Sequence, residues 1–316
     1  MIGAGYVGLV SAACLADFGH EVVCADTDEH KISGLRAGRV PIFEPGLSEL
    51  VLTNQGAQRL VFTNGLREAR RGASAIFIAV GTPSLAEVGS ADMHYVHDAT
   101  RAIAEVIEDF TVVVVKSTVP IGASDEVEHI IAERVPRDRF AVVSNPEFLR
   151  EGAAIEDFKQ PDRVVIGVEN ARAKDVMREI YRPIKRAGRP ILYTSRRSAE
   201  MIKYAANVFL AMKVTFINEI ADLCERVDAD VLDVSRGIGL DDRIGPKFLS
   251  PGPGFGGSCF PKDIWRLPNL QPRPNRRCDS SRHWLMLTTS ARSTWWRRSS
   301  PLAAAPSPAS GSPCSA

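Results

Sequence analysis

The chain opens with a glycine pattern that few folds can accommodate, Gly3-Ala4-Gly5-Tyr6-Val7-Gly8. This G-x-G-x-x-G is followed by small and apolar residues typical of a helix, 9–16, and then by a strand-like run, 21–25, that leads into Asp26. A glycine turn that opens a helix, with a second strand and an acid about 20 residues on, is the fingerprint of a dinucleotide-binding βαβ unit. We therefore predict a Rossmann-type domain at the N-terminus.

Asp26 is the residue expected to select the cofactor. A carboxylate at this position accepts a hydrogen bond from the adenosine ribose and repels a 2′-phosphate, so we predict NAD rather than NADP. The alternative is that Asp26 is only a turn residue at the end of a strand. The glycines let the backbone approach a pyrophosphate at the helix N-terminus. The cofactor contacts expected in this loop are Gly3, Gly5, Tyr6, Val7 and Gly8.

Strand-like and helical stretches alternate as far as residue 194. The expected strands are 59–63, 74–80, 111–116, 140–144, 163–168 and 190–194, and the clearest helices are 93–108 and 171–181. Uninterrupted apolar runs are typical of a parallel sheet covered on both faces, so we predict a doubly wound α/β domain over 1–194. Only Met1 and Ile2 precede the glycines, where a strand needs about five residues. We therefore expect that the coding start lies upstream or that the chain is clipped.

Polar loops follow three of these strands, at 81–83, 116–120 and 144–152. Ligands of open α/β sheets bind at the carboxyl ends of the strands, so we expect the three loops to face one cleft. Thr82 and Thr118 could instead serve only as turn residues. Glu147 and Glu151 are harder to explain as turn residues, because they are two carboxylates four positions apart with Arg150 between them.

A helix without Pro or Gly is predicted over 198–226. A helix of this length bridges domains or packs against a symmetry mate, so we expect a homodimer through it. Lys203 and Asn207 share one face of the helix, and their apolar neighbours favour a position in the cleft over a solvated one. A shorter helix is expected at 229–236.

The stretch 252–263, Gly-Pro-Gly-Phe-Gly-Gly-Ser-Cys-Phe-Pro-Lys-Asp, must be a shaped loop because its glycines and prolines exclude a helix or strand. Its thiol, Cys259, is followed by Lys262 and Asp263. A nearby cation favours the nucleophilic thiolate, so we interpret Cys259 as a reactive thiol rather than a small buried cysteine.

The composition excludes several classes of function. The six cysteines form no C-x-x-C pair, which argues against a zinc site and a disulfide framework and fits a reducing cytoplasm. No apolar run approaches the roughly 20 residues of a membrane span, and the N-terminus lacks the basic residues of a signal peptide. The basic excess is confined to 266–316, and the mildly acidic remainder speaks against a nucleic-acid partner. We therefore expect a cytoplasmic protein with no bound metal, membrane or nucleic acid.

With these segments in order, the chain resembles the UDP-glucose/GDP-mannose dehydrogenase family of nucleotide-sugar dehydrogenases. The matching segments are 3–8, 81–83, 117–120, 145–152, 203–207, 216–219 and 248–263. The block 254–263 is the most specific of them, and Phe260 within it is more similar to the UDP-glucose branch than to the GDP-mannose branch.

The resemblance implies a four-electron oxidation of UDP-glucose to UDP-glucuronate by two NAD molecules. It implies that Cys259 captures the aldehyde as a thiohemiacetal, which is then oxidised to a thioester. Lys203 and Asn207 would stabilise the oxyanion, Asp263 and Thr118 would hold a water, and Glu151 would be the base for hydrolysis. Further implied cofactor contacts are Asp26, Lys31, Thr82, Thr118, Glu151 and Lys262. The implied substrate contacts are Glu147, Phe148, Leu149, Arg150, Lys203, Asn207, Phe248, Leu249, Ser250, Pro251, Gly252 and Gly256.

The resemblance ends after residue 264, where the family continues into a second Rossmann-like domain. We divide the chain into an NAD-binding domain (1–194), a central helical and dimerisation region with the thiol loop (195–264), and an aberrant tail (265–316). The tail gains Arg, Pro, Ser and Trp and lacks Lys, so we expect a disordered frameshift product and weak or no activity. Two alternatives stay open: a dehydrogenase of another sugar nucleotide, such as GDP-mannose or a UDP-N-acetylhexosamine, and a non-catalytic fragment that binds NAD and dimerises.

Overall fold

The computed structural model describes residues 1–83 and 91–254. The chain forms two compact units, Met1–Ala205 and a second that begins at Ala206. The expected site residues Gly256, Cys259, Lys262 and Asp263, and the expected tail 265–316, lie outside the described residues.

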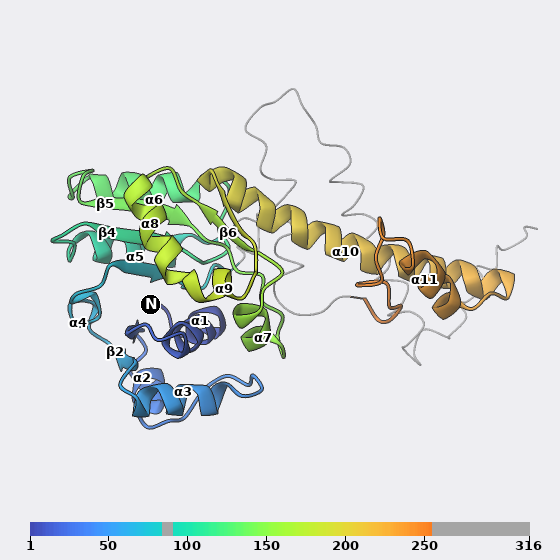
Figure 1. The fold of residues 1–316 in the computed structure, drawn as a ribbon, viewed down its shortest axis with the longest axis horizontal. Helices are drawn as coiled ribbons and strands as arrows, with labels where there is room; N and C mark the ends of the chain where they lie inside the picture. Colours follow the sequence, from blue (N-terminus) through green and yellow to red (C-terminus); the bar gives the residue numbers. More distant parts are fainter. Residues whose placement is uncertain (84–90, 255–316) are drawn as a thin grey trace, which may run out of the picture. The chain divides into compact units, whose positions relative to one another are not determined.

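The first unit is built on strands at the predicted places (Figure 1). They are β1 (Val22–Ala25), β2 (Leu60–Thr63), β3 (Ala75–Ile78), β4 (Thr111–Val115), β5 (Phe140–Ser144), β6 (Val164–Gly167) and β7 (Ile191–Thr194). β2 pairs with β1, and the other five follow in the order β3-β4-β5-β6-β7. Ile2 joins the two sets, because it forms parallel bridges to Ala25 of β1 and to Ile78 of β3. The first strand of the fingerprint is therefore reduced to one bridging residue in the middle of the sheet.

Helices cover both faces of the sheet, as predicted for a doubly wound fold. They are α1 (Tyr6–Asp17), α2 (Glu29–Arg36), α3 (Leu47–Gly56), α4 (Leu66–Arg70), α5 (His94–Ala104), α6 (Ala123–Ala132), α7 (Ala154–Lys159), α8 (Ala171–Ile180) and α9 (Arg182–Arg186). Successive residues of β4 enter opposite cores: Val112 and Val114 join a cluster with α1 and α8, whereas Val113 and Val115 join one with α5 and α6. The apolar run 112–115 thus reflects burial on both faces.

The sheet is not wholly parallel, and the sequence prediction is wrong on this point. β5 and β6 meet in antiparallel orientation at Ser144 and Gly167, while β7 runs parallel to β6. The chain leaves β5 at its carboxyl end, passes through α7 and returns alongside as β6. Hydrophobic pattern does not reveal strand direction, because a strand buried on both faces reads alike in either orientation.

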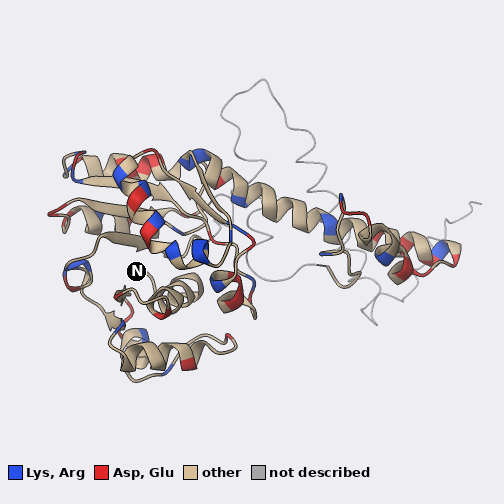
Figure 2. Ribbon diagram, in the orientation of Figure 1, with Lys and Arg blue, Asp and Glu red and all other residues tan. Residues whose placement is uncertain are grey.

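The predicted long helix is confirmed as α10 (Arg196–Val227), which begins in the first unit and continues through the second. α11 (Val231–Gly239) follows it. Between 204 and 218 the only charged residue of α10 is Lys213, and the middle of the helix is correspondingly tan in Figure 2. No helix within the described residues has the length and apolarity needed to cross a membrane.

Candidate active site

The three glycines of the N-terminal turn have different physical roles. Gly3 has a φ of +97°, and a Cβ on it would lie 2.6 Å from the Ala79 carbonyl oxygen. A Cβ on Gly8 would lie 1.9 Å from the Gly3 oxygen, so Gly8 lets α1 pack directly against the turn. Gly5 has no heavy atom within 4 Å of its Cβ position, and a side chain there would project into open space before the first turn of α1. A tight turn with clear space at the helix N-terminus fits a bound pyrophosphate.

Asp26 follows β1 and is held from two sides. Its Oδ2 accepts hydrogen bonds from the Ala4 amide at 2.7 Å and from Lys31 Nζ at 3.0 Å, and its Oδ1 accepts one from the Asp28 amide at 3.0 Å. Burial acts to raise the pKa of Asp26, but the hydrogen bonds from Asp28, Ala4 and Lys31 outweigh it and lower the pKa below its ordinary value. Asp26 is therefore ionised and fixed beside the glycine turn, as a ribose acceptor must be, and Lys31, a second expected cofactor contact, lies next to it.

Glu147 and Lys203 form an ion pair in the interior of the first unit. Lys203 Nζ lies 2.9 Å from Glu147 Oε1, and each side chain is 5% exposed. Glu147 Oε2 accepts the Leu149 amide at 2.7 Å, and the ring of Phe148 lies against Arg163 at 3.8 Å. The structure thus joins the loop after β5 to α10 through two residues that the sequence selects independently.

Lys116 is a buried cation near this pair that received no role in the sequence analysis. Its Nζ donates to Asn145 Oδ1 at 3.3 Å, and Tyr181 donates to the same oxygen at 2.5 Å. Burial lowers the pKa of Lys116 to about 8, although the charge of Glu147 acts in the opposite direction. The sequence did contain a signal for this residue, because a lysine that directly follows four valines lies at the carboxyl end of a buried strand, where ligands of such sheets bind.

Glu44 is a second residue that the sequence analysis did not single out. Its buried carboxylate accepts hydrogen bonds from the hydroxyl of Tyr6, from the Gly152 amide at 2.8 Å and from the Ala154 amide at 2.8 Å. It therefore fastens the loop that contains Glu151 to the dinucleotide turn. In sequence, Glu44 is an acid before Pro45 and cannot be distinguished from an exposed turn residue. Its structural role is visible only from its tertiary contacts.

The remaining predicted residues of the first unit have less central places. Arg150 is exposed and forms a salt bridge to Asp157 at 2.6 Å, so its charge is already paired. Glu151 is exposed next to it, and Leu149 is half-buried. The hydroxyl of Thr82 donates to the Thr118 carbonyl at 2.8 Å, which links the loops after β3 and β4.

The second unit carries Asn207 and the segment Phe248–Gly252. Asn207 is buried one turn beyond Lys203 on α10. Within the segment, Phe248 adopts a φ of +64°, the Leu249 carbonyl accepts from Ser235 at 2.6 Å, and the Gly252 amide donates to Asn218 Oδ1 at 2.9 Å. Ser250 is exposed and Pro251 half-buried. The described residues of both units contain no group of three or more His, Cys, Asp or Glu placed to hold a metal ion.

Comparison with known proteins agrees with this geometry. Residues 1–185 match the NAD-binding domain of the UDP-glucose/GDP-mannose dehydrogenase family, and residues 197–282 match its central domain, which extends the resemblance beyond residue 264. The chain is 63% identical to UDP-glucose 6-dehydrogenase of Rhizobium meliloti (strain 1021) over 269 residues, which cover 84% of the chain and 62% of that relative. It therefore spans less than two thirds of that relative's length.

Solved structures give the same result. A UDP-glucose dehydrogenase from the hyperthermophilic archaeon Pyrobaculum islandicum superposes with a TM-score of 0.86 at 42% identity, over 92% of this chain and 67% of that one. A GDP-mannose dehydrogenase from Pseudomonas aeruginosa superposes with a TM-score of 0.74 at 35% identity, over 94% of this chain and 68% of that one. The glycine turn, the fixed acid after β1 and the two matching domains together show that this chain belongs to the UDP-glucose/GDP-mannose dehydrogenase family.

Proposed function

We propose that this chain comprises the NAD-binding and central parts of a UDP-glucose 6-dehydrogenase, which oxidises UDP-glucose to UDP-glucuronate. The observation that carries the proposal is the 63% identity to a relative of that name. The lower identity to the GDP-mannose enzyme, 35% against 42% for the UDP-glucose enzyme of known structure, supports the choice of sugar nucleotide.

In this proposal the glycine turn and Asp26 would hold NAD, which would supply the hydride acceptor for two successive oxidations at the sugar C6. The thiolate of Cys259 adds to the aldehyde carbon between them, and the thioester formed by the second oxidation is hydrolysed to a carboxylate as the thiolate leaves. An ammonium has three protons, so Lys203 can hold Glu147 and still donate to an oxyanion at the reacting carbon. Asn207 is a second donor, Thr118 with Asp263 holds a water, and Glu151 is the base for hydrolysis.

The proposed contacts of the sugar nucleotide are those that the family resemblance implies. Glu147–Arg150 of the first unit and Phe248–Gly252 of the second are the proposed contacts, with Gly256 beyond the described residues. The salt bridge between Arg150 and Asp157 supports a positioning contribution for Arg150 through its backbone rather than its charge. We further propose a cytoplasmic homodimer formed through α10, because Phe209, Phe216 and Leu223 recur at intervals of seven and are each about half exposed.

The test is NADH formation by the chain with UDP-glucose, GDP-mannose and a UDP-N-acetylhexosamine in parallel. As in the sequence analysis, we expect at most weak NADH formation, with UDP-glucose as the one sugar nucleotide of the three that is oxidised and with two NADH per sugar. Faster NADH formation with GDP-mannose or a UDP-N-acetylhexosamine would contradict the assignment of UDP-glucose as the substrate. Saturable NAD binding without turnover of any of the three would favour the non-catalytic fragment.

Thiol labelling tests the nucleophile separately. Burial raises the pKa of Cys14 to about 12 and that of Cys24 to about 11, so both are poor thiolates, and Cys224 is buried as well. Iodoacetamide should therefore modify Cys259 first. Earlier labelling of Cys14, Cys24 or Cys224 would remove Cys259 from the mechanism.

A further inference from the structure

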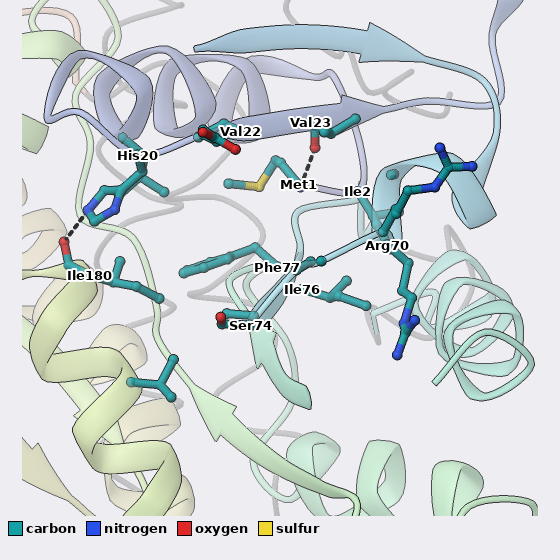
Figure 3. Close-up of a pocket in the computed structure, with 18 of the residues that line it drawn as sticks. Met1, Ile2, His20, Val22, Val23, Arg70, Ser74, Ile76, Phe77 and Ile180 are labelled. Carbon is teal, nitrogen blue, oxygen red and sulfur yellow. Dashed lines mark hydrogen bonds between the residues drawn. The ribbon is translucent and has the colours of Figure 1, made fainter. Parts of the chain in front are cut away.

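A cavity and the ligand-binding loops lie at opposite edges of the sheet of the first unit. The cavity is lined by the amino ends of β1 and β3, where Figure 3 shows Val22 and Ser74. Ligands of an open α/β sheet bind at the other edge, where the loops after β3, β4 and β5 begin. A residue that fixes one of these loops is therefore placed to act on a bound cofactor without touching it.

The loop after β4 ends at a glycine that cannot cap the next helix. Gly122 is the residue before α6, and its φ of +95° lies in the left-handed region that favours glycine. The first amides of a helix have no partner within the helix, and a Ser, Thr, Asp or Asn before the first turn commonly accepts from them. Because Gly122 has no side chain, α6 takes its cap from elsewhere in the chain.

Glu200 of α10 supplies that cap. Its Oε2 accepts the Gly122 amide at 2.7 Å, and its Oε1 accepts the Ser124 amide at 3.0 Å. Glu200 is 3% exposed and forms no ion pair within the described part of the chain. Burial raises the pKa of Glu200 above its ordinary 4.5, although the hydrogen bonds from Ser124 and Gly122 act in the opposite direction. A local Ser or Asp would cap α6 without burying a carboxylate. The distinctive result of this arrangement is that the cap joins α6 to α10.

The face of α10 that carries Glu200 also carries Lys203. Arg196, Glu200 and Lys203 follow one another at intervals of four and three residues, so they lie along one stripe of the helix. Arg196 forms salt bridges to Asp125 at 3.0 Å and to Glu128 at 2.6 Å, both on α6. Lys203 forms its ion pair with the loop after β5. The start of α10 is thus fixed by polar contacts to α6 and to a ligand-binding loop, all within the first unit.

Thr118 lies in a short loop that is held near both ends. At its start, the hydroxyl of Ser117 donates to the Val80 carbonyl at 2.7 Å. At its end, the Gly122 amide donates to Glu200. Pro120, between these two points, restricts the backbone further. Loss of the Glu200 carboxylate would release one of the two ends.

We propose that Glu200 is a positioning residue, which holds Thr118 in a fixed place relative to Lys203 by capping α6 from α10. This role rests on the proposed function, in which Thr118 contacts NAD and holds a water while Lys203 donates to the oxyanion. Glu200 acts only through these two residues. The contribution of the Thr118 hydroxyl to cofactor binding therefore depends on Glu200.

A double-mutant cycle of NAD affinity in the full chain tests this dependence. Thr118→Ala alone should weaken NAD binding about fivefold, the usual scale of one lost hydrogen bond. Added to Glu200→Ala, the same substitution should weaken NAD binding by less than about twofold, because the hydroxyl is no longer held in place. Hydrogen exchange at the Gly122 and Ser124 amides should become at least about tenfold faster in Glu200→Ala.

Two further variants control for stability. Val127 is fully buried in α6 and takes no part in the cap, so Val127→Ala loosens α6 by another route. In that background Thr118→Ala should keep its full effect on NAD affinity. Glu200→Gln keeps one accepting oxygen and serves if Glu200→Ala does not fold. It should reduce the effect of Thr118→Ala in the same direction, but by less.

Full additivity of Thr118→Ala and the Glu200 variant would overturn the proposal, as would unchanged exchange at Gly122 and Ser124. An unchanged NAD affinity in Thr118→Ala alone would overturn it too, because Glu200 would then have no group to position. So would an equal loss of the Thr118 effect in Val127→Ala, which would indicate general loosening of α6. The titrations use no sugar nucleotide. Failure of the chain to oxidise UDP-glucose would therefore count against the proposed function and leave this cycle unaffected.

Discussion

The two units of this chain differ in how they treat apolar surface. The first unit buries apolar residues on both sides of a sheet and places ionised groups such as Glu147 and Lys203 in its interior. The described part of the second unit leaves large apolar side chains exposed, including Phe209, Phe216, Leu223, Val227, Leu232, Leu240 and Ile244. The first unit thus buries its apolar residues against one another. The described part of the second unit exposes apolar side chains of the kind found in protein–protein interfaces.

The largest effect is expected where the first unit holds its buried ion pair. Lys203→Ala removes the ion-pair partner of the buried Glu147 carboxylate, and should lower the free energy of unfolding by about 3–5 kcal/mol in urea titrations. Lys213, on the same helix but in the second unit, donates among the described residues to the carbonyls of Ile244 and Gly245, which are neutral acceptors, so Lys213→Ala should cost about 1 kcal/mol. Equal losses of unfolding free energy in Lys203→Ala and Lys213→Ala would contradict the proposal that the buried ion pair stabilises the first unit more than the exposed contacts of Lys213 stabilise the second.

A double variant sharpens this result. Glu147→Gln with Lys203→Met removes both charges and should recover more than half of the lost stability. If the double variant is as unstable as Lys203→Ala alone, packing rather than charge holds the two elements together.

Cofactor selection is the next largest effect, and it belongs to the first unit alone. Asp26 is ionised and fixed beside the glycine turn, so NADP should bind at least about 100-fold more weakly than NAD. Competition titrations of the two cofactors measure the ratio, and Asp26→Ser should narrow it. Equal affinities for the unaltered chain would remove Asp26 from cofactor selection.

A smaller effect is expected at Glu44, which joins the dinucleotide turn to the loop of Glu151. Glu44→Gln replaces one accepting oxygen with a donor, so one of the Gly152 and Ala154 amides loses its partner. The cost should be about 1–3 kcal/mol, with faster hydrogen exchange at both amides. Glu49→Gln, an exposed change on α3, is the control and should alter neither quantity. Unchanged exchange in Glu44→Gln would show that the loop is held by other contacts.

The smallest effect on stability is expected at the exposed face of α10. Phe216→Ser combined with Leu223→Ser should change the unfolding of the first unit by less than about 0.5 kcal/mol. The same pair should shift the mass measured by analytical ultracentrifugation from dimer to monomer, whereas Phe43→Ser, which alters a residue 91% exposed in the first unit, should not. A monomeric unaltered chain would contradict the dimer.

Local pattern was sufficient to predict most of the first unit. Only one kind of structural element accommodates each of three sequence patterns: the glycine turn, the apolar run 112–115 and the stretch 198–226 without Pro or Gly. Strand direction was beyond this reasoning, and β6 runs opposite to β5 because direction depends on where the chain turns, not on which residues are apolar.

Sequence reasoning selected Asp26 from its place at the end of a strand, and in the structure this carboxylate is fixed beside the glycine turn. The pairing of Glu147 with Lys203 was not predictable from sequence, because 56 residues separate them and only the fold brings them together. Glu44 and Lys116 were missed for a related reason. Each is an ordinary charged residue in sequence, and burial alone makes it part of the site.

The burial of Lys116 couples folding of the first unit to the release of a proton. Its pKa falls from 10.5 in the unfolded chain to about 8 in the folded chain because burial disfavours the ammonium. Between these values the unfolded state binds the extra proton, so stability rises with pH in this window and unfolding takes a proton up. The heat of unfolding near pH 8 should therefore depend on the ionisation enthalpy of the buffer, and Lys116→Met should reduce that dependence. Folding of the first unit in this pH window therefore releases a proton from the Lys116 ammonium into the solvent.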